Sequence, residues 1–323
     1  MDNTIINWLL ESNPWTEYRT RLDLLDEAAD SPDVLSVRKV LVNHEKIKSL
    51  FEELKAWPGE VLKSHKSAGQ LYHKLSFIAE LGITIDDPGI MDIASKVRYN
   101  VSDEGPFQLK TNIPTHFGGT GKDQYAWMLC DTPLLVYSLI KMCLGASPDI
   151  IKAKNYLVQL GTENGYPCAA TKELGKFHGP GKKGLSCPYA TLLMLKLLSL
   201  DENDRNSKNS MDAIDSLLNL WENSRSLHPF IFYMGTDFRK LKAPLIWYDI
   251  LHLADTLSNF DYARNDLRYN EITQLISQKV DSEGKLTPES VWRAWKDWDF
   301  GQKKLPSPWL SFLVYRILHR KQT

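Results

Sequence analysis

The sequence predicts an all-α protein, an α/α toroid of about five to six helical hairpins with a repeat of about 60 residues. The first observation is a hexamer that occurs twice, as "FGGTGK" at 117–122 and as "FHGPGK" at 177–182, 60 residues apart. The second is that an apolar, helix-like run follows each hexamer. The third is that strand-like alternation is scarce, with "HPFIFYMG" as its single candidate. Repeated helical units of one length are typical of such an architecture.

The period continues on both sides of the two hexamers. An aromatic residue, followed by lysine and then by an apolar run, recurs at Trp57, Phe117, Phe177, Phe238 and Phe300. We expect these five residues to occupy equivalent places in successive repeats. The chain is therefore predicted to be a single domain over 1–323, in which 46–323 form five repeats and helices in 1–45 complete the ring.

Two kinds of helix alternate along the chain, and we count about twelve in total. "CPYATLLMLKLLSL" is apolar almost all round, which suits a buried helix. "APLIWYDILHLADTLSNF" and "SPWLSFLVYRILHR" carry proline near the first helical turn, where its missing N–H costs nothing. "SPDIIKAKNYLVQLG" and "NSMDAIDSLLNLWEN" are amphipathic. Buried helices that alternate with amphipathic ones indicate two concentric rings; a solenoid, whose inner helices are less uniformly apolar, is the alternative.

Composition and charge exclude several classes of protein. The chain has 323 residues, of which 43% are hydrophobic and 24% charged, as in ordinary globular proteins. The net charge of −1 disfavours nucleic acid as a partner, because no global field draws the protein to phosphate. No run reaches the roughly 18 apolar residues of a membrane span, and the opening does not resemble a signal peptide. Four cysteines do not suggest a disulfide framework, so we expect a cytoplasmic protein with reduced thiols.

The loops that lead into the apolar runs are rich in cations. The loop residues predicted to bind substrate are Lys63, Lys66, Lys122, Asp123, Lys182, Lys183, Arg239, Lys240, Lys242, Lys303 and Lys304. In a toroid these loops share one rim, where helix N-termini add positive potential and the hexamer glycines let backbone amides approach an anion. We therefore expect a pocket for phosphate, diphosphate or a carboxylate; solvated surface lysines are the alternative.

The "GTGK" string does not make a phosphate-binding P-loop. That motif needs Ser or Thr after the lysine, where Asp123 stands here, and it needs an earlier glycine, where His116 stands. We also expect no strand before the hexamer, whereas a P-loop joins a strand to a helix. The hexamer is therefore interpreted as a loop that introduces a helix.

Aromatic and titratable side chains occur near the same loops. The candidates to line a substrate cavity are Trp127, Trp247 and Trp298. The candidates to transfer protons are Asp131, Asp249, His73, His178 and Tyr248. For any single tryptophan core packing is the competing interpretation, and for each histidine it is a surface or structural role.

Three further residues could bind a metal. Cys130, Cys187 and His252 lie at or near the expected starts of buried helices and carry side chains that zinc prefers. Buried free thiols are the alternative for the two cysteines. We expect no metal or other cofactor, with zinc and magnesium as the alternatives.

The repeat resembles that of a known family. The period, the turns such as Glu104-Gly105 and Asn164-Gly165, and the proline-led helices resemble the prenyltransferase and squalene-cyclase repeat of terpenoid cyclases and protein prenyltransferase β subunits. The resemblance covers the chain from about residue 45 onward. The opening "NWLLESNPWTEYRTRLDLL" resembles the start of bacterial and archaeal proteins that carry this repeat. The resemblance implies an α/α toroid with an aromatic-lined cavity.

These observations predict a protein that binds an anionic, partly apolar small molecule in a lysine- and aromatic-lined toroid cavity. Transfer or cyclisation of a prenyl diphosphate is the leading expectation. A lyase or hydrolase acting on acidic saccharides is the first alternative; there lysine neutralises a carboxylate while histidine or tyrosine abstracts a proton. A non-catalytic ligand-binding module is the second, favoured by the absence of the Asp-x-Asp-Asp acid of squalene cyclases.

Overall fold

The computed structural model describes residues 2–175, 186–228 and 232–321. Its helix content is 53%, and the described residues form 15 α-helices and one small sheet of two strands, which confirms the all-α class. Within the described ranges, no helix combines the length and the apolar character that crossing a bilayer requires. The chain divides into two compact units: unit 1 comprises Met1–Leu50 and Gly235–Thr323, and unit 2 comprises Phe51–Met234. Each unit is described by itself.

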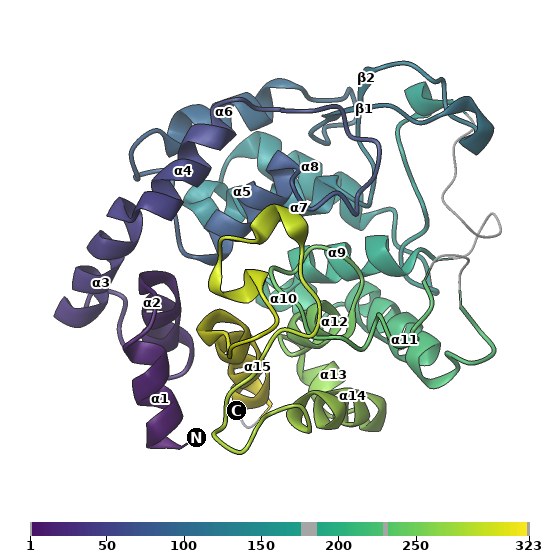
Figure 1. Cartoon of the computed structure of the whole chain (residues 1–323). Coiled ribbons are helices and arrows are strands. Elements are labelled where there is room, and N and C mark those ends of the chain that lie inside the picture. The colour runs from purple at the N-terminus through teal and green to yellow at the C-terminus, as the bar shows by residue number, and fades with distance from the viewer. Residues whose placement is uncertain (1, 176–185, 229–231, 322–323) are drawn as a thin grey trace. The chain divides into compact units, whose positions relative to one another are not determined.

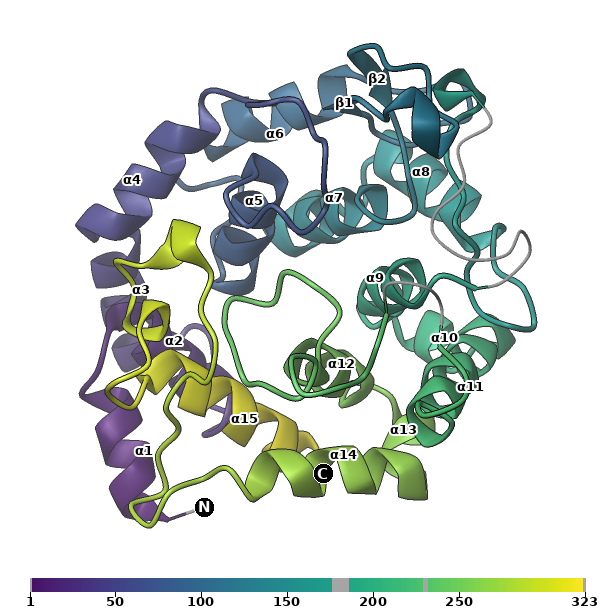
Figure 2. The ribbon, with the colours of Figure 1, turned by 45° about the vertical axis from the view of Figure 1, so that its right-hand side comes forward.

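Unit 2 is built on helices that are buried on all or nearly all sides. These are α5 (Leu71–Glu80), α7 (Thr132–Leu139) and α9 (Pro188–Leu198). Helix α7 packs against both α5 and α9 (Figures 1 and 2). Pro133 and Pro188 stand in the first turns of α7 and α9, as the sequence predicts. The apolar runs therefore form the interior of this unit.

Each buried helix of unit 2 precedes a helix with one buried face. These partners are α6 (Ile90–Tyr99), α8 (Pro148–Val158) and α11 (Lys208–Glu222), with the short α10 (Glu202–Arg205) before α11. Helix α8 packs on α7, and α11 packs on α9. The predicted alternation of buried and amphipathic helices is thus present in this unit.

A two-stranded hairpin in unit 2 corrects the sequence interpretation of the first hexamer. Strand β1 (Leu109–Thr111) pairs antiparallel with β2 (Gln124–Ala126), and Lys110 lies opposite Tyr125. The hexamer 117–122 lies in the loop between them, so the expectation that no strand precedes it was wrong. The loop returns into a strand and not into a helix, so it still differs from a P-loop. The residues of "HPFIFYMG" that the structure describes form no strand.

Unit 1 combines helices from both ends of the chain. They are α1 (Asn3–Leu10), α2 (Pro14–Asp23), α3 (Pro32–Asn43) and the start of α4 (Glu45–Leu54), followed by α12 (Ile250–Leu257), α13 (Asp261–Arg264), α14 (Leu267–Ser277) and α15 (Pro308–Arg320). Helix α15 packs against α1, α2, α12 and α14 (Figure 2). Every residue of α12 is buried. The C-terminal helix therefore holds the two parts of unit 1 together.

Short irregular helices complete the chain. They are η1 (Thr115–Phe117), the π-helical η2 (Ile140–Leu144), η3 (Lys172–Leu174), η4 (Arg293–Trp295) and η5 (Asp299–Gly301). At the end of η2, Cys143 adopts a left-handed conformation with φ 72°. This turn ends the helical run that starts with α7.

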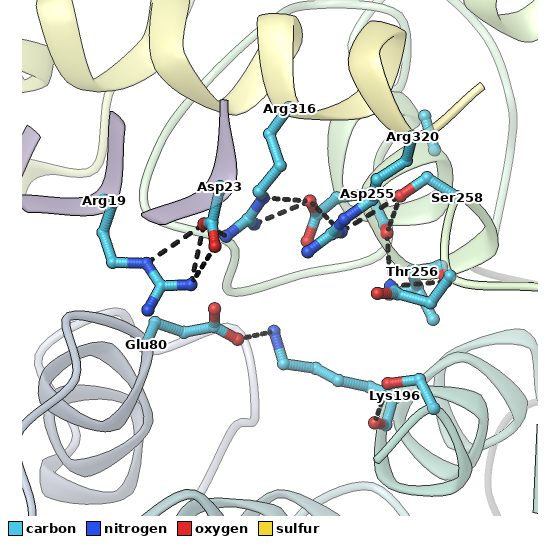
Figure 3. A network of polar contacts seen from close by, with 12 residues as sticks. Arg19, Asp23, Glu80, Lys196, Asp255, Thr256, Ser258, Arg316 and Arg320 are labelled. Atoms are coloured by element: carbon cyan, nitrogen blue, oxygen red, sulfur yellow. Dashed lines mark hydrogen bonds and ion pairs between the residues drawn. The ribbon is translucent and has the colours of Figure 1, made fainter. Parts of the chain in front are cut away.

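A network of charged residues is buried in unit 1 (Figure 3). Arg316, 2% exposed, places Nη2 2.6 Å from Asp255 Oδ1 and Nη1 3.7 Å from Asp23 Oδ2. Arg19 pairs with Asp23 at 2.6 Å, and Arg320 lies 3.5 Å from Asp255. Burial opposes the ionisation of Asp23, but the three arginines outweigh it and lower the pKa of this carboxyl. The network joins α2, α12 and α15.

Unit 2 contains a separate buried ion pair. Lys196 stands in the apolar run of α9 and is almost fully buried. Its Nζ lies 2.7 Å from Glu80 Oε1 (Figure 3). The same Nζ lies 4.8 Å from the centre of the Tyr137 ring. Tyr137 donates its hydroxyl to the same carboxylate. The pair therefore joins the three buried helices α5, α7 and α9.

The aromatic markers of the repeat do not share one environment. Phe238 and Phe300 are buried, at 4% and 0% exposure, and Trp57 is 9% exposed. Phe117 is 61% exposed, so the expectation of equivalent places was wrong for this copy. Phe177 lies outside the described residues.

Candidate functional site

The structure places most of the predicted loop cations at the surface. The exposed ones are Lys63, Lys66, Lys122, Arg239, Lys303 and Lys304. Lys240 is half-buried and Lys242 is buried. Lys182, Lys183 and His178 lie outside the described residues. Among the predicted loop cations that the structure describes, Lys242 therefore differs from the others in being buried.

The glycines of the first hexamer serve the turn. The N–H groups of Gly118, Gly119 and Gly121 donate to the carbonyls of Thr115, Pro114 and Ile113, at 2.9, 3.3 and 2.9 Å. A Cβ atom at Gly119 would lie 2.2 Å from Ile113 O, so only glycine fits there. The expectation that these amides face an anion was wrong, because the turn already uses them. Asp123 accepts a hydrogen bond from Asn112 Nδ2 at 2.8 Å.

A histidine–aspartate pair forms in unit 2 between two loops. His65 Nε2 lies 2.9 Å from Asp131 Oδ2. The Asp131 side chain is fully buried, whereas 14% of the His65 side chain is exposed. The carboxylate can only accept, so Nε2–H donates and Nδ1 is the nitrogen left to accept a proton. Asp131 was predicted as a catalytic residue; His65 was not.

Two side chains of α5 fix the position of His65. The hydroxyl of Tyr72 donates to the carbonyl of His65 at 3.2 Å, and His73 Nε2–H donates to the same oxygen at 2.9 Å. Burial, together with the nearby Tyr189 and Asp131, raises the pKa of Tyr72 well above its usual value, so its hydroxyl remains a donor. His73, predicted to transfer protons, is buried and holds the backbone of the neighbouring histidine instead.

Asp131 is fixed as firmly as its partner. Its Oδ1 accepts the N–H of Met128 at 3.2 Å and the hydroxyl of Thr132 at 3.0 Å. Its backbone carbonyl accepts from Leu134 at the start of α7. The other carboxylate oxygen is thereby directed to His65. This arrangement resembles the second half of a catalytic triad, in which a buried carboxylate sets the tautomer of a histidine.

Three cysteines lie next to this pair. Antiparallel bridges between Met128 and Ala170, and between Pro167 and Ser186, bring the segments that carry Cys130, Cys168 and Cys187 together. Burial raises the pKa of the Cys130 thiol well above its usual value and that of Cys187 to about 12, and the neighbouring thiols add to both shifts. These two thiols are therefore protonated near neutral pH. In the described part of the chain, no three His, Cys, Asp or Glu residues converge as metal ligands would.

A second titratable cluster lies in unit 1. Asp249 caps α12: its Oδ1 accepts the N–H of His252 at 3.0 Å. The carboxyl is fully buried, and burial raises its pKa to about 7 although Lys242 acts in the opposite direction. The buried His252 ring donates from Nδ1 to the carbonyl of Trp247 at 3.0 Å. Tyr248 is buried with its ring 5.2 Å from that of Phe238.

The candidate tryptophans differ in burial. Trp127 is 3% exposed and meets the ring of Tyr156 edge-on at 5.5 Å. Trp298 stacks on Phe300 at 5.6 Å and lies 4.8 Å from Trp15. Trp247 is half-buried. Trp127 and Trp298 make the contacts that core-packing residues make.

Comparison with known proteins leaves the class of protein open. No protein-family model and no curated protein matches this chain. A crystal structure of a protein from Actinoplanes aligns with 97% of this chain and 91% of that chain, at 12% identity and a TM-score of 0.43. Similarity at this level carries no functional argument, so function is inferred from the side chains.

His65 could have been found from the sequence by one signal. It stands between Lys63 and Lys66 in a loop that was singled out for its charge. Its partner is 66 residues away, and no spacing rule connects them. The sequence therefore identified the carboxylate and the loop but not the contact between them.

Proposed function

We propose that the protein is an enzyme that binds an anionic, partly apolar small molecule and uses His65 to move a proton. The observation that carries this proposal is the pair of His65 and the fully buried Asp131, which are 2.9 Å apart. A histidine whose tautomer is set by a buried carboxylate is suited to general acid–base catalysis. Lys63 and Lys66, both exposed and in the same loop, supply positive charge next to it.

The roles of the residues follow from their contacts. Asp131 accepts from Nε2–H and stabilises the imidazolium that forms when Nδ1 takes a proton from substrate. Tyr72 and His73 act as positioning residues, because they hold the carbonyl of His65 and not its ring. A substrate carboxylate held by Lys63 or Lys66 would make a proton on the adjacent carbon more acidic. Loss of that proton, with departure of the group on the next carbon, forms a carbon–carbon double bond.

This chemistry favours a lyase acting on acidic saccharides over prenyl-diphosphate transfer. A proton acceptor beside cations is what β-elimination next to a carboxylate needs. Diphosphate departure depends on neutralising the leaving group and needs no base in its first step. Prenyl-diphosphate chemistry is therefore the second candidate, favoured by the repeat pattern in the sequence.

We extend the proposal to the architecture: the helical hairpins close into an α/α toroid with the substrate loops on one rim. The alternation of α5, α7 and α9 with α6, α8 and α11 supports it for unit 2. In unit 1 the buried α12, followed by the partly buried α14, supports it. In such a ring the loops before the buried helices lie at one end.

The test is an activity panel with a matched pair of variants. Oligosaccharides that contain uronic acid are assayed for the ultraviolet absorbance of a new double bond, and prenyl diphosphates for release of inorganic diphosphate. His65→Gln should lower turnover by about 10²–10⁴-fold, the usual contribution of a general base. His116→Gln, at an exposed histidine of the same unit, should leave turnover unchanged.

Two results would count against the proposal. Turnover that survives His65→Gln would remove the histidine from the mechanism. If neither panel is turned over and mass spectrometry of native protein finds a tightly bound anion, the protein is a binding module and not an enzyme.

A further inference from the structure

Lys242 and Asp249 in unit 1 have no role in the acid–base site proposed above. Lys242 is 3% exposed, yet its Nζ makes no hydrogen bond in the described part of the chain. The nearest carboxylate oxygen belongs to Asp237, 3.8 Å away, and that side chain is 64% exposed. Lys242 Nζ also lies over the ring of Trp292, 4.6 Å from the centre of that ring. A buried ammonium group has three N–H donors, and one long ion pair and a cation–π contact do not use all of them.

The surrounding backbone holds Lys242 in place. Leu241 O accepts from Glu289 N–H at 2.9 Å, and Leu241 N–H donates to Glu289 Oε2 at 2.7 Å. Trp292 Nε1–H donates to Pro244 O at 3.1 Å. These bonds hold the segments on either side of the Lys242–Trp292 contact. The ammonium and the indole are therefore pre-organised, which lowers the entropy that a ligand would lose on binding.

Asp249 contributes a second unsatisfied group. Its Oδ1 caps α12, but its Oδ2 is buried and has no hydrogen-bond partner among the described residues. Lys242 is the charge that acts most strongly on this carboxyl. A buried polar atom without a partner is costly, so Asp249 Oδ2, which feels the charge of Lys242, marks a place for a group that can bind both this oxygen and the ammonium.

We propose that Lys242 and Asp249 bind the carboxylate group of a small monoanion with an apolar body. One ligand oxygen accepts from the ammonium group, and the other accepts from Oδ2–H of Asp249. The apolar body lies against the indole of Trp292. A single cation neutralises a single negative charge, so a phosphate dianion is disfavoured here, with Asp237 adding further repulsion.

The ability of Asp249 to donate follows from its environment. Burial raises the pKa of this carboxyl to about 7, so a large share of it is protonated near neutral pH. An ionised Asp249 would instead repel the ligand. The site is independent of the proposed function, because it shares no residue with the pair of His65 and Asp131.

The experiment uses the full chain and benzoate as the probe, with calorimetric titration at about pH 6, where Asp249 is mostly protonated. Benzoate should bind saturably, with a dissociation constant in the range of about 1 mM or tighter. Lys242→Met should weaken it about tenfold or more, because a charge-assisted hydrogen bond is lost. Asp249→Ala should weaken it about fivefold. Lys240→Met is the control, since this lysine also pairs with Asp237 but is half-buried; it should bind benzoate like the wild type.

Melting curves of each variant establish that it is folded. Three outcomes would overturn the proposal. If no saturable heat appears up to about 10 mM benzoate, the two groups hold only water. If folded Lys242→Met binds as tightly as the wild type, the ammonium is not the anion contact. If inorganic phosphate binds as tightly as benzoate, the ligand is not a monocarboxylate.

Discussion

Replacing Arg316 with methionine removes one partner of a buried ion network and keeps most of the length of the side chain. Arg316 is 2% exposed and contacts Asp255 at 2.6 Å and Asp23 at 3.7 Å. Without it Asp255, which is 4% exposed, keeps only Arg320 at 3.5 Å. Asp23 keeps Arg19 at 2.6 Å. The change therefore leaves the Asp255 carboxylate buried with a weak partner.

The expected cost follows from that geometry. Breaking a buried pair costs about 3–5 kcal/mol, because one charge remains uncompensated. Since Arg320 still compensates part of the charge on Asp255, we expect about 3 kcal/mol. With a urea dependence of about 3 kcal/mol per molar, the unfolding midpoint should fall by about 1 M. Circular dichroism in a urea titration measures this shift.

Two further variants separate the pair from its surroundings. Replacing both Arg316 and Asp255 with leucine removes the charges together, and should cost less than about 1 kcal/mol or be stabilising. Lys208→Met breaks a pair with Asp212 in which the lysine side chain is 79% exposed, and should cost about 0.5 kcal/mol or less. If Arg316→Met costs less than about 1 kcal/mol, or if the double variant costs as much as the single one, the reasoning about the buried charge is wrong.

Three other variants test the local structure. The pKa of Asp249 is raised from 3.8 to about 7 in the folded protein, so its favourable contribution to stability is complete below about pH 4 and is lost as the pH rises through 7. Asp249→Asn can still cap α12, so its free energy of unfolding should equal that of the wild type at about pH 4 and exceed it by roughly 3–5 kcal/mol at pH 8. Chemical denaturation at the two pH values measures this difference. If the two proteins show the same pH dependence, the argument from burial is wrong. Gly119→Ala should destabilise unit 2 by about 1–3 kcal/mol, because the added Cβ would lie 2.2 Å from Ile113 O. A Cβ at Gly235 would have no atom within 4 Å, so Gly235→Ala should change stability by less than about 0.5 kcal/mol. A thermal melt in which the two glycine variants behave alike would show that the hairpin loop can shift.

The sequence predicted the buried helices well because their signals are local. Proline in the first turn and an uninterrupted apolar run, as in Pro188–Leu198, are enough to identify a buried helix. It also showed lysine and arginine inside two such runs, at Lys196 and Arg316, but not the carboxylates they meet. Those partners come from other helices, and one sequence carries no information on such distances.

The hairpin was missed for a different reason. Strands β1 and β2 have three residues each, too few for an alternation to be recognised. The glycine hexamer between them was read as an anion loop because its glycines allow that use. The N–H groups of Gly118, Gly119 and Gly121 are taken by carbonyls, which depends on the turn as a whole. The same limit hid the contact of His65 with Asp131.

The composition of unit 1 from two distant stretches of chain has a consequence for the order of assembly during synthesis. Residues 1–50 are synthesised before the rest of unit 1, yet α15, which packs on α1 and α2, follows about 250 residues later. Unit 2 is continuous in sequence and can complete its packing meanwhile. The apolar faces of α1 and α2 therefore stay exposed until α15 has been synthesised. Apolar surface exposed in this way is where chaperones bind and aggregation begins. Synthesis of the last helix is therefore the step that ends the exposure of the first ones.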